Sequence, residues 1–207
     1  MKVLLFNGSG NENGCTFTAL STVAESLNKN GIDTEIIQVG KQPVRDCIGC
    51  GACKKSDGHC VFKDDMVNEI IDKAKEADGF IFGSPVYYAH PSGRLLTLMD
   101  RLFYAGSAAF AYKPAAAVVS ARRAGTTASL DAITKHFTIN NMPVVSSNYW
   151  NMVHGNKPEQ VLQDLEGLQI MRMLGNNMAW LLKCIEAGKN AGLEPVKEDK
   201  IWTNFIR

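Results

Sequence analysis

Residues 2–18 read Lys-Val-Leu-Leu-Phe-Asn-Gly-Ser-Gly-Asn-Glu-Asn-Gly-Cys-Thr-Phe-Thr, and this stretch decides the fold of the chain. Residues 2–7 form a short apolar run of the kind found in buried strands. A polar loop with glycines (8–14) follows, and from Cys15 the pattern is helical as far as Lys29. The free N–H groups at the start of such a helix point back at the loop, where they bind an anion, most often a phosphate.

The composition of this loop indicates which phosphate it suits. No Gly-Lys-Ser/Thr closes it, which excludes a Walker A loop. The second predicted strand ends in Val39-Gly40-Lys41 and lacks the acid of a dinucleotide fingerprint. Residues 8–18 contain no Lys or Arg, so a phosphate would be held by hydroxyls, amides and backbone N–H groups. Neutral donors favour the monophosphate of FMN over a triphosphate that needs Mg²⁺ and a lysine; an ordinary glycine turn before a helix is the alternative.

The rest of the chain alternates predicted strands with predicted helices. Strands are expected at 33–39, 78–83, 113–120 and 142–146, and helices at 64–76, 92–104, 126–137 and 158–189, with Gly175 as a candidate break in the last. This alternation predicts a parallel sheet with helices on both faces. The unusual loops 8–16, 84–93 and 120–125 all follow strands, so we expect them to meet at the carboxyl edge of the sheet, where such sheets bind ligands.

Length and charge limit the class of protein. We expect the chain to form a single domain over residues 1–207, and its net charge of +1 gives no sign of a nucleic-acid partner. No apolar run is long enough to cross a membrane, and the first strand is too short for a signal peptide, so a cytoplasmic location without a membrane partner is predicted. In that reducing compartment the six cysteines are expected to be metal ligands or thiols rather than disulfides.

Four of the cysteines lie close together in the loop that follows the second predicted strand. Cys47, Cys50, Cys53 and Cys60 have the spacing C-x2-C-x2-C-x6-C. C-x2-C-x2-C is a ferredoxin-like signature, and four thiolates can hold a [4Fe–4S] cube. A tetrahedral zinc site and a set of free thiols or a redox pair are the alternatives.

Several of these segments together resemble a known family. The resemblance rests on Gly8-Ser9, Gly14-Cys15-Thr16, Gly83-Ser84-Pro85-Val86-Tyr87-Tyr88, Gly93 and Asp100-Arg101. They are similar to the NADPH-dependent FMN reductase family, and the cysteine loop is similar to that of the iron–sulfur flavoproteins within it. The resemblance covers residues 2–185. It implies an α/β flavodoxin-like fold, a doubly wound sheet of five parallel strands in the order 2-1-3-4-5, with the cysteine loop after strand 2 and a long C-terminal helix.

The resemblance also implies which residues bind the cofactor, and no catalytic acid or base is expected because FMN carries the reaction. The FMN phosphate would be surrounded by Ser9, Asn11, Cys15, Thr16 and Phe17. The ribityl chain and the ring edge would be wrapped by Pro85, Val86, Tyr87 and Tyr88, with Gly93 allowing close approach. The pyrimidine end would be lined by residues 120–125, with Ser120, Arg122, Arg123 and Gly125 among them. The chain departs from the family at Asn11, where many relatives carry Arg, and at Cys15, where a small polar residue is common.

The function implied is an FMN-dependent oxidoreductase that passes electrons from NAD(P)H to a small acceptor such as a flavin or a quinone. Arg122 or Arg123 would stabilise the reduced pyrimidine or meet the nucleotide phosphates, unless the two form a solvated pair. One alternative is an iron–sulfur electron carrier that uses a [4Fe–4S] cluster and receives electrons from ferredoxin. The other is a zinc-holding binding module without redox turnover. The wide apolar face of the last helix predicts a homodimer or a tetramer.

Overall fold

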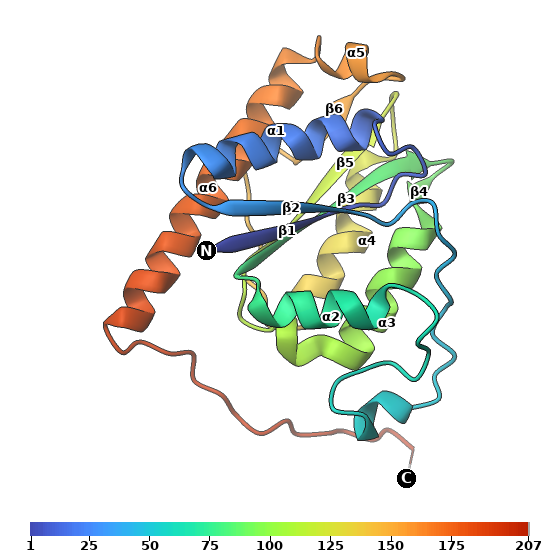
Figure 1. Ribbon diagram of the computed structural model, residues 1–207, viewed down its shortest axis with the longest axis vertical. Coiled ribbons are helices and arrows are strands. Elements are labelled where there is room, and N and C mark those ends of the chain that lie inside the picture. The colour runs from blue at the N-terminus through green and yellow to red at the C-terminus, as the bar shows by residue number, and fades with distance from the viewer. Residues whose placement is uncertain (207) are drawn as a thin grey trace.

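The structure, a computed structural model, describes residues 1–206, which form a parallel sheet between two layers of helices (Figure 1). The strands are β1 (Lys2–Asn7), β2 (Asp33–Gln38), β3 (Gly79–Tyr87), β4 (His90–Pro91), β5 (Ala115–Ala121) and β6 (Met152–His154). The helices are α1 (Cys15–Lys29), the short 3₁₀ helix η1 (Ala52–Lys55), α2 (Val67–Glu76), α3 (Gly93–Phe110), α4 (Thr126–Thr138), α5 (Pro158–Val161) and α6 (Leu165–Asn190).

The order of the parallel strands is β2-β1-β3-β5-β6. This confirms the predicted order 2-1-3-4-5, and the one added strand is the two-residue β4, which pairs antiparallel with the end of β3. Helices α1 and α6 cover one face of the sheet, and α2, α3 and α4 cover the other (Figure 1). The carboxyl ends of β1, β3 and β5 therefore lie side by side at one edge.

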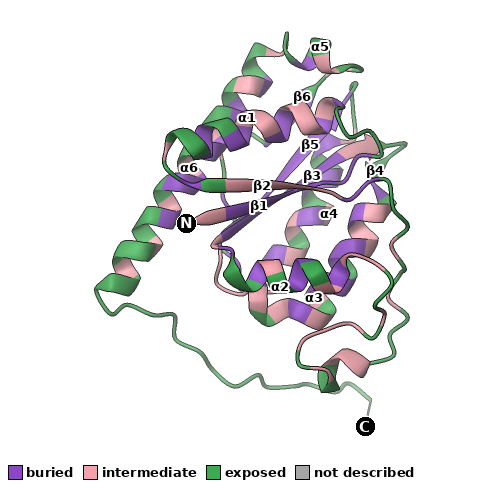
Figure 2. Ribbon diagram, in the orientation of Figure 1, coloured by how far each residue is buried: buried purple, intermediate pink, exposed green. Residues whose placement is uncertain are grey.

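The core explains why the central strands are continuously apolar. Successive side chains of a strand point to opposite faces, and β1 is buried on both: Phe6 packs toward α2 and α3, whereas Leu5 packs toward α1 and α6. On the first of these faces the rings of Phe6 and Phe82 stack with their centroids 4.4 Å apart. Figure 2 shows the buried residues concentrated in the sheet and in the helix faces turned toward it. A rigid core thus supports the strand ends.

The last parallel strand lies later in the chain than predicted. We expected it at 142–146, but only Val144 pairs there, in an isolated bridge with Ala115. Pro143 accepts a bond from Ala115 N at 2.9 Å through its carbonyl oxygen, but it has no N–H with which to extend the pairing. The edge strand is instead β6, which pairs with β5 from Val119 to Ala121.

Two predicted helix boundaries are also wrong. Helix α2 begins at Val67 rather than at residue 64, because Asp65 lies outside it and accepts a hydrogen bond from Val67 N at 3.2 Å. The break in the C-terminal helix falls before Leu165, where the side chain of Asp164 caps α6 by accepting a bond from Gly167 N at 2.9 Å. Gly175 is no break: a Cβ there would lie 2.6 Å from Ser26 Cβ, so this glycine lets α6 pack closely against α1.

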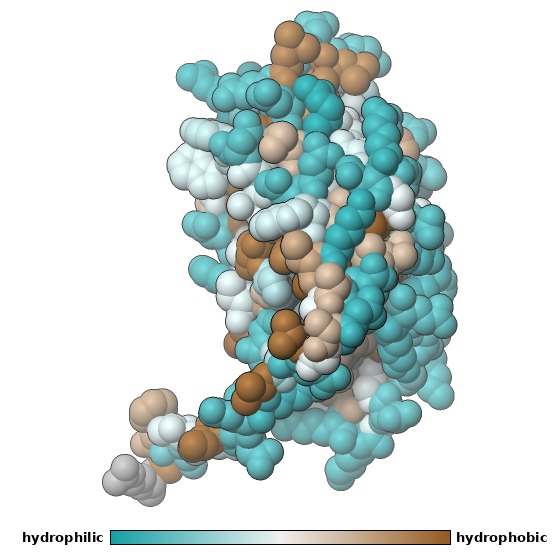
Figure 3. Space-filling view, turned by 90° about the vertical axis from the view of Figure 1, so that its left-hand side faces the viewer, coloured by the Kyte–Doolittle hydropathy of each residue, from teal (hydrophilic) through white to brown (hydrophobic). Residues whose placement is uncertain are grey.

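The surface bears on two further predictions. No helix within residues 1–206 combines the length and the apolar character that a membrane-spanning segment needs. Figure 3 shows the side of the molecule that carries α6, where hydrophobic and hydrophilic side chains are interspersed. Leu165 and Trp180 of α6 are exposed, while Met171, Leu174 and Met178 are buried against the sheet. A subunit interface on this helix stays a prediction.

Candidate functional site

The loop after β1 is tied directly to the end of β3. Gly8 N donates to the carbonyl oxygen of Gly83 at 2.8 Å, and Gly10 N donates to the hydroxyl of Tyr87 at 3.2 Å. A Cβ at Gly8 would lie 2.9 Å from that same carbonyl oxygen, so this close approach requires glycine. The loop 8–14 and the segment 84–88 therefore meet, as the sequence predicted.

The end of β5 joins the same site from the other side. The hydroxyls of Thr16 and Ser120 lie 2.8 Å apart and are buried, which links the first turn of α1 to β5. Gly125 has a φ of +90° and packs against Val86, whose Cγ1 would lie 2.8 Å from a Cβ at this position. The segment 120–125 thus contacts both earlier loops, and all three predicted segments come together at one edge.

The loop 8–14 is shaped by its own side chains. Ser9 is 5% exposed and its Oγ accepts a bond from Asn11 N at 3.1 Å, while Asn11 Oδ1 accepts one from Asn13 N at 3.3 Å. Gln38 Nε2 donates to the carbonyl oxygen of Ser9 at 2.8 Å. The sequence analysis missed Gln38 and its neighbour Gly40. The signal that could have found them is their place at the carboxyl end of the strand beside β1.

The first turn of α1 presents free hydrogen-bond donors to this loop. Gly14 is the N-cap residue and provides no side-chain cap, and the first turn contains no acidic residue. The N–H groups of residues 15–17 precede the first helical bond, which runs from Thr18 N to Gly14 O at 3.0 Å. The nearby carboxylate of Glu12 is paired with Lys41 at 3.0 Å. The geometry suits an anion held by neutral donors.

The remaining predicted residues are buried to different degrees. Cys15 is half-buried, and burial raises the pKa of its thiol, so it is a neutral donor, with Gly155 O 3.5 Å away. Phe17 and Pro85 are also half-buried. The exposed members of the predicted set are Asn11, Tyr87, Tyr88, Gly93, Arg122 and Arg123. These three segments therefore combine exposed side chains with the buried polar residues Ser9, Thr16 and Ser120.

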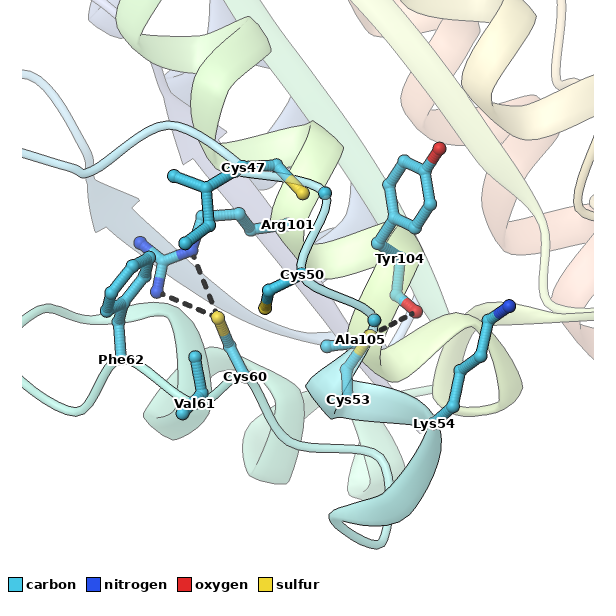
Figure 4. A pocket seen from close by; sticks show the side chains of 13 residues that line it. Cys47, Cys50, Cys53, Lys54, Cys60, Val61, Phe62, Arg101, Tyr104 and Ala105 are labelled. Atoms are coloured by element: carbon cyan, nitrogen blue, oxygen red, sulfur yellow. Dashed lines mark hydrogen bonds between the residues drawn. The ribbon is translucent and has the colours of Figure 1, made fainter.

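The four loop cysteines lie elsewhere, beside α3. They line a common cavity of about 160 Å³ together with Phe62, Arg101 and Tyr104 (Figure 4). Cys50 is exposed, and the other three cysteines are half-buried. Gly49 and Gly51 have φ values of +64° and +68°, a conformation that glycine adopts without strain, and this lets the chain turn sharply between the cysteines.

Two of these cysteines are held by α3. Cys60 Sγ accepts hydrogen bonds from Arg101 Nε and Nη2, both at 3.3 Å, and Cys53 Sγ donates to Tyr104 O at 3.6 Å. Within residues 1–206, no three His, Cys, Asp or Glu side chains are close enough together to hold a metal ion. The donor set nevertheless fits a [4Fe–4S] group, because four cysteine sulfurs around one cavity are the ligands that such a cluster uses.

Arg101 is the residue of this region that the sequence analysis left without a role. Its side chain is 1% exposed and forms an ion pair with Asp65, whose side chain is 3% exposed. Burial lowers the pKa of the guanidinium, but its hydrogen bonds to Asp65 and Cys60 outweigh that effect and raise this pKa above its ordinary value. Asp65 and Arg101 are 36 positions apart, so only the fold could show that they form a pair.

The buried pair predicts a large effect on stability. We expect Asp65→Asn to lower the free energy of unfolding by about 3 kcal/mol or more, because it leaves a buried guanidinium without its counter-charge. Asp64→Asn is the matched control: Asp64 pairs with Arg45, and both side chains are more than half exposed, so little change is expected. Urea denaturation of the two variants measures the difference. Equal losses would show that the Asp65–Arg101 pair contributes no more than a surface pair.

Comparison with known proteins agrees with this geometry. Residues 1–157 match the family described as NADPH-dependent FMN reductase. An iron–sulfur flavoprotein of Methanocaldococcus jannaschii is 35% identical over 194 residues, which cover 90% of this chain and all of that protein. An iron–sulfur flavoprotein of Methanosarcina thermophila is 27% identical over 195 residues, covering 92% of this chain and all of the relative.

Solved structures of flavodoxin-like proteins have a similar fold. A solved archaeal flavodoxin superposes with a TM-score of 0.60 at 17% identity, over 88% of this chain and 99% of the flavodoxin. At that identity the likeness concerns the fold alone, and it confirms the flavodoxin-like class. The match to the family extends over three quarters of the chain and includes the three loops that meet at the sheet edge. The chain therefore belongs to the NADPH-dependent FMN reductase family.

Proposed function

We propose that this flavoprotein oxidoreductase binds FMN where the three loops meet and a [4Fe–4S] cluster on the Cys47/Cys50/Cys53/Cys60 loop, and that it exchanges electrons between flavin and cluster. The observation that carries the proposal is that all four cysteines line one cavity although they span fourteen positions of a loop. Two relatives that match this chain over their whole length are named iron–sulfur flavoproteins, which supports the proposal. Ferredoxin is the proposed donor, because a cluster exchanges single electrons with another cluster protein.

The residues of the sheet edge have defined tasks in this proposal. The N–H groups at the start of α1, with the hydroxyls of Ser9 and Thr16, would hold the phosphate of FMN, while Asn11, Cys15 and Phe17 enclose it. Tyr87 keeps the first loop closed against β3 through its bond to Gly10 N. Pro85, Val86, Tyr88 and Gly93 would lie along the ribityl chain and the ring, and Ser120 and Gly125 at the pyrimidine end. The bound flavin supplies the redox chemistry.

A second candidate function is turnover with NAD(P)H and a small acceptor such as a flavin or a quinone. The description of the family, which names NADPH, supports it. Arg122 and Arg123 are exposed directly after β5, where a second planar molecule would approach the flavin, and guanidinium groups bind phosphates well. A homodimer formed through the exposed apolar residues of α6 is part of the proposal in either case.

The first experiment is the visible spectrum of anaerobically purified protein, with iron and acid-labile sulfide assayed on the same sample. Flavin bands over a broad brown absorbance, with about four irons and four sulfides per chain, are expected. Addition of NADPH, NADH or reduced ferredoxin then identifies the electron donor by bleaching of the flavin. Flavin without iron would leave only the second candidate, and protein that stays colourless after FMN is added would contradict both.

Tyr88 provides a local test of the proposed flavin site. It is fully exposed and has a φ of +61°, which is costly for a residue with a Cβ. We expect Tyr88→Gly and Tyr88→Ala to weaken FMN binding equally, since both remove the ring. The free energy of unfolding of Tyr88→Gly should be about 1 kcal/mol higher than that of Tyr88→Ala, because glycine relieves the strain. FMN titration and thermal unfolding measure the two effects. Unchanged FMN affinity in both variants would remove Tyr88 from the proposed site.

A further inference from the structure

The buried guanidinium of Arg101 is directed at a single sulfur atom. Helix α3 places Arg101 behind the cysteine loop, and its Nε and Nη2 both donate to Cys60 Sγ at 3.3 Å, as the dashed lines in Figure 4 show. Two parallel N–H donors from one rigid planar group are the arrangement with which guanidinium groups bind anions. Cys60 lies among the ligands of the proposed cluster, so this inference rests on the proposed function.

The position of Arg101 is fixed from three further sides. Its Nη1 forms the ion pair with Asp65 and also donates to the carbonyl oxygen of Arg45 at 3.1 Å. The ring of Phe62 lies against the guanidinium, with its centroid 5.3 Å from Cζ. A side chain that is 1% exposed and held in this way cannot turn away from the sulfur, and an arginine cannot lose its proton in a protein. The cavity therefore has a permanently protonated guanidinium on one wall, which binds its counter-charge, Asp65, at Nη1 and directs Nε and Nη2 at the sulfur.

Within residues 1–206, the other three loop cysteines have no comparable partner. Cys53 uses its sulfur as a donor to Tyr104 O, and Cys50 is exposed to solvent. Among the hydrogen bonds of residues 1–206, Cys60 is the one loop cysteine whose sulfur accepts any. Negative charge on the cysteine sulfurs is thus stabilised chiefly at Cys60, by the hydrogen bonds from Arg101.

Hydrogen bonds to ligand sulfurs and nearby charge are among the factors that set the reduction potential of an iron–sulfur cluster. Uptake of one electron adds one negative charge to the cluster and its thiolates, and a fixed cation stabilises the form with more negative charge. We propose that Arg101 raises the reduction potential of the cluster by donating two hydrogen bonds from a buried, permanently charged guanidinium to Cys60 Sγ. Arg101 is thus a positioning residue that acts through Cys60.

The test is a redox titration of the anaerobic holoprotein with dithionite and mediators, followed by the electron paramagnetic resonance signal of the reduced cluster. We expect Arg101→Gln to lower the ratio of reduced to oxidised cluster at least about tenfold at a fixed ambient potential, which corresponds to about 59 mV for one electron. Arg101→Lys retains the charge but not the paired donors, so its shift should be smaller. The titration of FMN in the same samples should not move.

Lys54→Gln is the matched control, because Lys54 lines the same cavity but is exposed, so its charge is screened by solvent. A shift in Arg101→Gln no larger than that in Lys54→Gln would overturn the proposal. Loss of iron from both Arg101 variants with FMN retained would also overturn the proposal. The guanidinium would then be needed for the loop to bind the cluster rather than to set its reduction potential. Wild-type protein that contains FMN but no iron would refute the cluster itself, which is a failure of the proposed function and is distinguished by the iron assay.

Discussion

Cys50→Ala is expected to lose most of its iron and to keep a full complement of FMN. Cys50 is the exposed member of the four loop cysteines and lines the cavity that they share. Removing one of four thiolate ligands leaves an iron of the cube without its protein donor. None of the residues predicted to bind FMN lines this cavity, so the flavin should be unaffected. Iron and acid-labile sulfide per FMN, measured anaerobically, give the result.

Cys184→Ala is the matched control for this variant. Cys184 is also exposed, but it lies on α6, which covers the opposite face of the sheet. Cys184→Ala is at an exposed position and should not alter the free energy of unfolding by more than about 0.5 kcal/mol. Cys50→Ala should lose only the stabilisation that the bound cluster supplies. Cys60→Ala should lose iron and stability together, because it removes the acceptor of two bonds from Arg101. Full iron content in Cys50→Ala would show that the four-cysteine loop is not the site of the cluster.

The parallel sheet and the meeting of the three loops could be predicted because they depend on local patterns, whereas the order of the strands was implied by the family resemblance. The apolar run of β1, the glycines after it and the helical pattern from Cys15 are contiguous in the sequence. Parallel strands joined by helices then bring the loops after β1, β3 and β5 to the same edge. The buried contact between Thr16 and Ser120 is a consequence of that topology.

The parts that could not be predicted depend on pairings between distant segments. Asp65 was predicted to lie in the first turn of a helix. Its carboxylate instead forms an ion pair with Arg101, and α2 begins at Val67. For Asp65, an interaction with a distant residue thus overrides the local preference. The residues around Val144 have the composition of a strand, but Pro143 lacks the N–H needed to extend the pairing with β5 beyond one bridge, which is a local signal that the prediction overlooked.

The glycine at the end of β2 predicts the second large effect. Gly40 is buried, and a Cβ at this position would overlap the carbonyl oxygen of Ser9, which also accepts a bond from Gln38 Nε2 at 2.8 Å. Because the obstacle is backbone, the loop 8–14 must move to make room. We expect Gly40→Ala to weaken FMN binding by about 100-fold, or roughly 2.7 kcal/mol, and to lower the free energy of unfolding by about 3 kcal/mol.

Two controls separate displacement of the loop from a general loss of folding. Gly10→Ala is in the same loop, but its Cβ would be in ordinary contact at 3.7 Å from Tyr87 Oη, so the protein can accept it without moving. Gly188→Ala lies in α6, where its Cβ would be in ordinary contact at 3.9 Å from Leu193 Cβ, and it should raise the free energy of unfolding by about 0.5–1 kcal/mol with unchanged FMN affinity. FMN titration below the unfolding temperature of each variant measures the effect on binding. If Gly40→Ala bound FMN as tightly as Gly188→Ala, the loop held against β2 would not be the phosphate site, because a displaced backbone cannot keep its donors aimed at the same anion.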